Sequence, residues 1–171
     1  LPACERFVEE ARIRIALGGS ASDATLSEDE RILSPSDFGF HNARRAPSGE
    51  VLYCDFEYFG WDDPAKTLID FVLHPAMALP EDLAQRYAQR FFQVFQEDDL
   101  LRLRVDAVYP LFGLKWCLIL LNEFVPGDLQ RRALTDGTSE SNASVQFAQL
   151  EKARQLLHRI TQQDARFPYD N

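Results

Sequence analysis

The segment from Leu33 to Asp55 constrains the fold most, because its pattern differs from that of the rest of the chain. Prolines and glycines that interrupt helices punctuate it at residues 35, 39, 47 and 49. Residues 51–54, Val-Leu-Tyr-Cys, are β-prone. We therefore predict a loop over residues 34–42, then a hairpin that turns at residues 46–50 and whose second strand ends at Asp55. So short a hairpin is marginal alone, so we expect it to lie against helices.

The remainder of the chain has mostly helical periodicity. We predict helices from Glu5 to Leu17, from Pro64 to Leu73, and along the apolar stripe formed by residues 83, 87, 91 and 95. A helix near residues 100–108 is expected to end at Pro110, and a buried helix follows it. Apolar residues from 147 to 160 mark a last amphipathic helix. The predicted fold class is therefore mainly α with one small hairpin.

Composition excludes several classes of partner. The chain has 18 basic and 27 acidic residues, a net charge of −9, so we expect no nucleic-acid or anionic-membrane surface. Cys4, Cys54 and Cys117 lack the CxxC spacing of metal sites and are odd in number, which favours reduced thiols. The longest apolar run, residues 110–125, is too short to cross a bilayer. We predict a soluble, cytoplasmic protein.

A single domain over residues 1–171 fits a chain of this length and 46% hydrophobic content. Gly18-Gly19-Ser20 has no lysine after it and no apolar strand before it, so a linker over residues 18–26 is preferred to a phosphate-binding loop. Residues 134–144 are mostly small and polar and predict a flexible loop. Because residue 1 is Leu and not Met, we expect the natural N-terminus to have been removed.

Three polar residues suggest a chemistry. Asp37 and Asn42 form an Asp-x-x-x-x-Asn loop, and Asp55 follows eighteen residues after Asp37 at the predicted strand end. Phosphoryl transfer from MgATP needs a carboxylate that accepts the proton of the attacking hydroxyl, and oxygen ligands for Mg²⁺. Asp37 suits the first task, and Asn42 with Asp55 suits the second. The loop pattern alone arises often by chance, and the added Asp at the strand end makes it more specific.

The same stretches resemble a known family. Ser-Asp-Phe-Gly-Phe-His-Asn at residues 36–42 and Asp-Phe-Glu-Tyr-Phe-Gly-Trp-Asp-Asp-Pro at residues 55–64 are similar to the C-terminal lobe of the aminoglycoside phosphotransferase and choline kinase superfamily. Residues 114–123 look like a bacterial branch of it. The similarity is strong over residues 33–70 and looser over 111–132. It implies a protein-kinase-like helical lobe, with one hairpin carrying the catalytic loop and the metal-binding Asp.

The resemblance also implies an activity and roles for the matched residues. The activity is ATP-dependent phosphorylation of a hydroxyl on an amino sugar, amino alcohol or saccharide. Asp37 would be the catalytic base, Asn42 and Asp55 the Mg²⁺ ligands, and Glu57 a support for the metal shell. The matched positions expected to be structural are Asp63, Asp70 and His41.

Two departures from the family pattern qualify this expectation. Pro35 stands where the family has a histidine that braces the loop. Residues 1–33 hold no glycine-rich loop, strand lysine or partner glutamate, so the N-terminal lobe that clamps the nucleotide has no counterpart in this chain. We therefore expect a fragment of a longer kinase that is inactive alone. The alternative is a non-catalytic kinase-like helical module for binding or regulation.

Other interpretations of single residues stay open beside these. The Asp-Phe-Gly of residues 37–39 spells the metal-binding tripeptide of protein kinases, but no Asp-x-x-x-x-Asn loop precedes it at the required distance. An ordinary protein kinase is disfavoured for a similar reason, since Asp-Phe-Glu begins at Asp55. His41 can be a general base, although bracing the loop is preferred. Four further residues are expected to have no functional role: His74 at a helix end, His158 in solvent, and Trp61 and Trp116 in the core.

Overall fold

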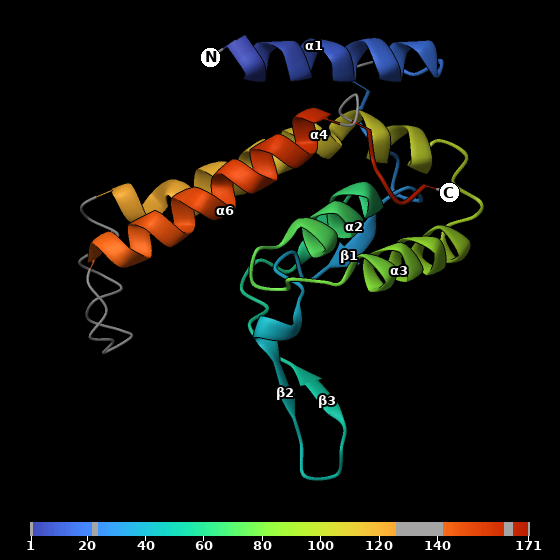
Figure 1. Ribbon diagram of the computed structural model, residues 1–171. Helices are drawn as coiled ribbons and strands as arrows, with labels where there is room; N and C mark the ends of the chain where they lie inside the picture. The colour runs from blue at the N-terminus through green and yellow to red at the C-terminus, as the bar shows by residue number, and fades with distance from the viewer. Residues whose placement is uncertain (1, 22–23, 126–141, 163–165, 171) are drawn as a thin grey trace.

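The computed structural model describes residues 2–21, 24–125, 142–162 and 166–170, which are mainly helical with small antiparallel sheets (Figure 1). The helices are α1 (Pro2–Leu17), α2 (Pro64–Leu73), α3 (Glu81–Val94), α4 (Leu101–Leu120) and α6 (Asn142–Gln162). Short 3₁₀ helices are η1 (Phe40–Asn42) and η2 (Leu121–Phe124). The strands are β1 (Ile32–Ser34), β2 (Ala43–Arg45), β3 (Val51–Tyr53) and β4 (Gly60–Asp62). The mainly α fold class is thus confirmed.

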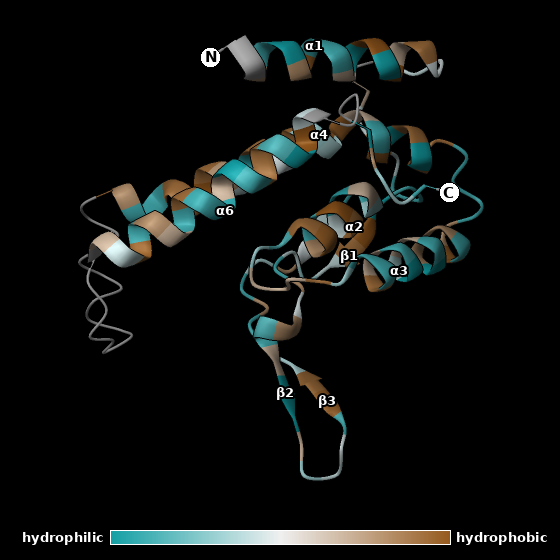
Figure 2. Ribbon diagram, viewed as in Figure 1, coloured by the Kyte–Doolittle hydropathy of each residue, from teal (hydrophilic) through white to brown (hydrophobic). Residues whose placement is uncertain are grey.

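Helix α4 is the centre of the helical body. It packs against α1, α2 and α6, and each of these contributes fully buried side chains such as Phe7, Leu68 and Ile160. Figure 2 shows α2 as largely hydrophobic, as expected for a helix that is buried along most of its length. Gly113 permits the close approach of α4 to α6, because a Cβ there would lie 2.5 Å from Cγ2 of Ile160.

Pro110 lies inside α4, so the predicted break between two helices is wrong. Pro110 and its neighbour Tyr109 are fully buried, and burial of the flanking apolar turns offsets the hydrogen bond that a proline removes. With η2, the segment Leu101–Phe124 is long and apolar enough to cross a membrane by length and composition alone. Its place between α1, α2 and α6 is that of a core helix.

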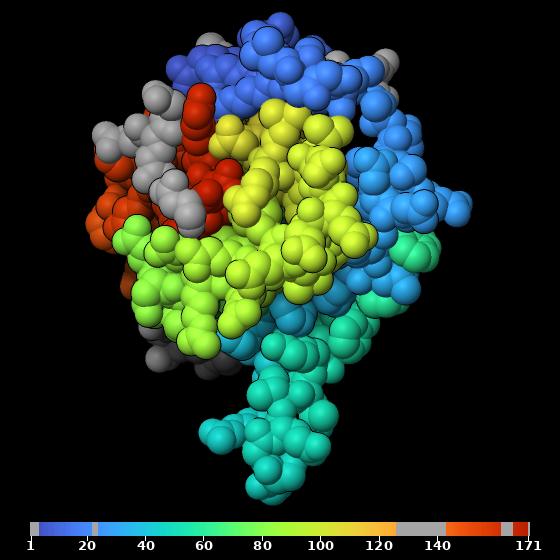
Figure 3. All heavy atoms as spheres, turned by 90° about the vertical axis from the view of Figure 1, so that its right-hand side faces the viewer, coloured from blue at the N-terminus to red at the C-terminus, as the bar shows by residue number. Residues whose placement is uncertain are grey.

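The predicted hairpin and its turn are confirmed, but its second strand ends at Tyr53 and not at Asp55, and its surroundings differ from the prediction. Strands β2 and β3 pair with Arg44 opposite Leu52, and the turn is closed by a hydrogen bond from Ala46 N to Glu50 O at 2.8 Å. Figures 1 and 3 show the hairpin projecting from the helical body, so the expectation that it lies against helices is wrong. Its base is attached by Phe38, whose ring lies 4.7 Å from that of Tyr53.

A second two-stranded sheet corrects the prediction of a single hairpin. Strands β1 and β4 pair antiparallel, with Leu33 opposite Trp61. Trp61 is 64% exposed, so the expectation that it anchors the core is wrong, whereas Trp116 is buried as expected. At the end of β1, Ser34 accepts a hydrogen bond from the hydroxyl of Thr67 on α2 at 3.0 Å. The sheet therefore fixes the start of the predicted catalytic loop to α2.

The remaining predicted segments agree with the structure in part. On α3 the buried face is formed by Ala84, Ala88 and Phe92, one position away from the predicted stripe, and Leu83 is exposed. The described residues of the 18–26 linker, 18–21 and 24–26, form no helix or strand. Of the predicted 134–144 loop, residues 134–141 lie outside the described residues, and residues 142–144 belong to α6, which contradicts the prediction there.

Candidate functional site

Residues 34–42 form a tight loop that presents the carboxylate of Asp37 beside the end of α2. Ser36 has a φ of 63°, a left-handed conformation uncommon for residues other than glycine. The amide of Asp37 bonds to Pro35 O at 2.7 Å, and Lys66 on α2 donates to the Ser36 hydroxyl at 2.8 Å. The short helix η1 then carries His41 and Asn42 back toward Asp37.

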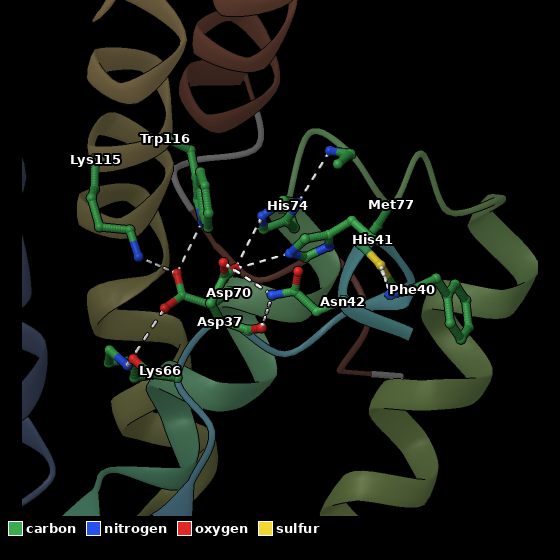
Figure 4. A network of polar contacts seen from close by, with 12 residues as sticks. Asp37, Phe40, His41, Asn42, Lys66, Asp70, His74, Met77, Lys115 and Trp116 are labelled. Carbon is green, nitrogen blue, oxygen red and sulfur yellow. Dashed lines mark hydrogen bonds and ion pairs between the residues drawn. The ribbon is translucent and has the colours of Figure 1, made fainter. Parts of the chain in front are cut away.

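Three side chains contact Asp37 through their nitrogen atoms (Figure 4). Nε2 of His41 lies 3.1 Å from Oδ1 of Asp37, and Nε2 of His74 lies 3.4 Å from the same atom. The side-chain amide of Asn42 donates to the main-chain oxygen of Asp37 at 3.0 Å and to Oδ2 at 3.3 Å. Because its NH₂ group is turned to Asp37, Asn42 leaves its carbonyl oxygen for another partner. The structure therefore brings Asp37, His41 and Asn42 together.

His74 is the site residue that sequence reasoning missed. It caps the C-terminal end of α2, as expected, but its ring also stacks on that of His41, with centroids 4.0 Å apart and planes 12° apart. The ring of Trp116 is roughly perpendicular to that of His74, with their centroids 4.4 Å apart. Burial, and then the neighbouring His41, lower the pKa of His74 to about 4, so the ring is neutral near pH 7.

The loop packs closely against the residues behind the two histidines. A Cβ on Gly39 would lie 2.6 Å from the His41 ring and 2.8 Å from Sδ of Met77, so only glycine fits. The amide of Phe40 points at the same sulfur at 3.0 Å. Nδ1 of His41 is buried and has no hydrogen-bond partner within the part of the chain that the structure describes. The position of the His41 ring is therefore fixed by packing as well as by Asp37.

Asp55 and Glu57 lie on the exposed segment that follows β3. Asp55 has a φ of 66° and is not part of the group formed by Asp37, His41 and His74, whose ligand atoms lie within 4.8 Å of one another. Glu57 bonds to the Tyr58 hydroxyl, which raises the pKa of Tyr58, and the charges of Asp55 and Asp37 raise it further. Glu57 and Asp55 therefore both raise the pKa of the Tyr58 hydroxyl. Asp55 does not belong to the cluster of possible metal ligands that contains Asp37.

The kinds of donor atom decide which ion would fit. The two Nε2 atoms point at Asp37 from parallel rings, the arrangement of hydrogen-bond donors and not of lone pairs that converge on a metal. Oxygen atoms of Asp37 and Asn42, with Asp55 from the adjoining segment, are the kind that Mg²⁺ prefers. The donor set fits Mg²⁺ in chemistry, although Asp55 lies outside the group formed by Asp37, His41 and His74.

A cleft of about 510 Å³ opens beside Asp37. Residues of α2, α4 and α6 line it, together with Tyr58 and the turn after α2. Its charged or hydrogen-bonding side chains are Ser36, Asp37, Tyr58, Lys66, Asp70, His74, Lys115, Trp116, Glu123, Gln149 and Lys152. This volume is within the range of small-molecule sites.

Asp70, which lines this cleft, connects side chains of α2 and α4. Its buried carboxylate pairs with Lys115 and with Lys66 at 3.8 Å, and accepts from the indole N–H of Trp116 at 2.9 Å. Burial raises the pKa of Asp70, and the attraction of Lys115 opposes that rise. These contacts join α2 to α4, which agrees with a structural role for Asp70.

Asp63 is the N-cap of α2. Its carboxylate accepts from the amide of Ala65 at 2.8 Å and pairs with Arg104 on α4 at 3.1 Å. Arg104 also pairs with Asp98 at 2.6 Å. Asp63 thus connects the end of β4 to the following helix, the structural role that the sequence resemblance implied.

Comparisons with protein-family models, with curated proteins and with solved structures each found no match. The family resemblance of residues 33–70 therefore stays a prediction, and only the geometry of the site bears on what the chain does.

Proposed function

We propose that this chain is the C-terminal lobe of a phosphotransferase that moves the γ-phosphoryl group of MgATP to a hydroxyl of a small molecule. One observation carries the proposal: the Asp37 carboxylate, held by three side-chain donors, lies at the edge of a cleft of about 510 Å³. A carboxylate fixed beside a cavity is the arrangement that a proton acceptor for a bound hydroxyl requires.

The site residues have separate tasks in this proposal. A carboxylate has roughly four lone-pair positions, and the three donors leave about one for the hydroxyl of an acceptor in the cleft. Asn42 orients Asp37 through its NH₂ group, and its carbonyl oxygen together with the Asp55 carboxylate would hold Mg²⁺. The ion, when bound, supplies positive charge to the triphosphate. Asp37 takes the proton of the hydroxyl as its oxygen bonds to the γ-phosphorus and the bond from that phosphorus to the departing ADP oxygen breaks.

The first prediction tests the catalytic residues in a full-length protein that includes a nucleotide-binding lobe. Asp37→Asn is expected to lower turnover by about 10²- to 10⁴-fold, because it removes the proton acceptor. Asp55→Asn is expected to lower turnover and to raise the Mg²⁺ concentration that turnover requires, because it removes a metal ligand. Asparagine tolerates the φ of 66° at this position. ADP release in the presence of amino sugars, amino alcohols and saccharides is the measurement.

The exposed Asp99→Asn is the matched control, because Asp99 lies at the turn after α3, far along the chain from the loop. It should leave ADP release unchanged. Full turnover in both Asp37→Asn and Asp55→Asn would exclude the phosphotransferase mechanism.

A non-catalytic helical module is the second candidate function. It is favoured by the position of Asp55, which lies outside the group that Asp37 forms with the two histidines. Titration calorimetry of MgATP into the full-length protein separates the two functions. A kinase should release measurable heat that Asp55→Asn reduces, whereas a non-catalytic module should release almost none.

A further inference from the structure

Two imidazoles from separate elements face one oxygen of Asp37. His41 comes from η1 within the loop, and His74 comes from the end of α2, yet their Nε2 atoms lie 3.1 and 3.4 Å from the same Oδ1. The rings are stacked and nearly parallel. Both side chains are largely buried, with 22% and 13% of their surfaces exposed. The two imidazoles are therefore packed into the protein, whereas the Asp37 side chain that they face is 39% exposed.

The position of the proton on His74 follows from its second nitrogen. The amide of Ala76 donates to Nδ1 at 3.1 Å, so in the neutral ring Nδ1 is the acceptor and Nε2 carries the hydrogen. That hydrogen points at Asp37. His41 has the same polarity, because an unprotonated Nε2 would set its lone pair against a carboxylate oxygen. Both histidines are thus donors to Asp37.

We propose that His74 is a positioning residue for Asp37, which fixes the carboxylate relative to the helical body while the stacked His41 fixes it relative to its own loop. This inference rests on the proposed function for its catalytic consequence. His74 is itself held from three sides, by Ala76, by the edge of Trp116 and by the ring of His41. A donor so constrained sets the direction of the remaining lone pair of Asp37 toward the cleft.

The first test measures geometry without any activity. Long-range ¹⁵N–¹H spectra of the imidazoles in this chain at pH 7 should show His74 as the Nε2–H tautomer and a proton on Nε2 of His41, with the exposed His158 as the reference. Asp37→Asn should change the Nε2 shifts of both rings and leave His158 unchanged. An Nδ1–H tautomer at His74 would overturn the proposal. So would a large shift of both Nε2 signals on adding Zn²⁺ alone, because the pair would then be a metal site.

The second test separates the donor from the ring in the full-length protein. His74→Gln retains an N–H near the position of Nε2 and loses the ring, whereas His74→Phe retains the stacked ring and loses the donor. We expect His74→Phe to lower kcat by about 10- to 100-fold with little change in the KM for MgATP, since small displacements of a catalytic group have effects of this size. His74→Gln should retain most of the activity, and His158→Phe all of it.

The outcomes distinguish this inference from the proposed function. If Asp37→Asn is inactive while His74→Phe keeps the wild-type kcat, the positioning role is wrong and the phosphotransferase stands. If Asp37→Asn retains full activity, the proposed function is wrong, and the tautomer measurement alone decides whether His74 orients the carboxylate. Equal losses in His74→Phe and His74→Gln would also overturn the positioning role, because they would trace to the ring and not to its donor.

Discussion

At the scale of single residues, the two buried or half-buried carboxylates of the site have different kinds of partner. Asp70 is paired with lysines, whereas Asp37 is contacted by the side-chain nitrogens of two histidines and an asparagine. A lysine beside Asp37 would compete with a reacting proton for the carboxylate, whereas the uncharged amide of Asn42 only orients it. Lys66 and Lys115 are therefore paired with Asp70, and Asp37 lines the cleft without a lysine partner among the described residues.

The low pKa of His74 has a consequence for stability. Its folded value is about 4 and its ordinary value 6.5, so between these pH values the unfolded chain binds a proton that the folded chain does not. The free energy of unfolding should therefore fall as pH drops from 6.5 to about 4, by up to about 3 kcal/mol from this group. The ionisable groups that face His74 are His41, Asp37 and Lys115.

A difference measurement isolates the contribution of His74. Urea denaturation of the wild type and of His74→Gln between pH 4 and 7.5 gives the free energy of unfolding of each. The gap between the two proteins should be largest near pH 7 and narrow toward pH 4. A gap that stays constant with pH would show that His74 titrates normally in the folded chain.

The sequence could predict Asp37 and Asn42 because both belong to one short loop, where spacing alone brings them together. It could not predict His74, because the end of a helix has no local signal for a contact with an earlier loop. Pro35 stands where a histidine was expected to brace the loop. The structure places two imidazoles on Asp37 instead, one from within the loop and one from α2.

At the scale of elements, strong hydrophobic periodicity predicted the long helices. The short strands β1 and β4 were not predicted, because their sequence signals are weak. Strands β1 and β4 have three residues each, which is too short for an alternating pattern, so their pairing depends on tertiary contacts. Pro110 gave a false signal, because the rule that proline ends a helix neglects the burial of both flanking turns. Local rules thus failed where packing decided the outcome.

The contact between α2 and α4 leads to a prediction about Asp70. Burial raises its pKa, so the folded state does not depend strongly on its charge, and the indole N–H of Trp116 is the partner that most needs it. Asp70→Asn retains an acceptor and should cost less than about 1.5 kcal/mol. Asp70→Ala leaves the buried indole without a partner and should cost about 2–4 kcal/mol.

Thermal or urea unfolding of the two variants measures this difference, with Asp99→Ala as an exposed control that should change stability by less than about 0.5 kcal/mol. If Asp70→Asn were as destabilising as Asp70→Ala, the pairing with Lys66 and Lys115 would be the main contribution, and the bond to Trp116 a minor one.

At the scale of the whole molecule, the described chain has two unequal parts. The helical body has a shared core, whereas the hairpin of β2 and β3 projects from it, and every residue of β3 is exposed (Figure 3). Asp55 follows directly after this hairpin, so the proposed metal ligand lies on the less constrained part and the proposed base on the more constrained one. The sequence indicated the hairpin but not this separation, because exposure depends on what packs beside it.

Hydrogen exchange should show the two parts directly. Amides of a two-stranded hairpin without a packed face open at small free-energy cost, whereas those in the middle of α4 open only with the core. Peptides covering residues 43–53 should therefore exchange at least about a hundredfold faster than those covering residues 105–117. Similar protection in both regions would mean that the hairpin is covered by something in solution.

The same measurement follows Asp55 when nucleotide binds. In the full-length protein, MgATP should slow exchange over residues 51–59, because the proposed site forms only if Asp55 turns toward Asn42 and is held there by the ion. Asp55→Asn should remove most of this slowing and leave exchange without nucleotide unchanged, since both side chains tolerate the left-handed backbone. Asp99→Asn should behave as the wild type. Turnover of MgATP with no protection at residues 51–59 would assign the metal to other ligands and leave Asp55 a surface residue of the hairpin base.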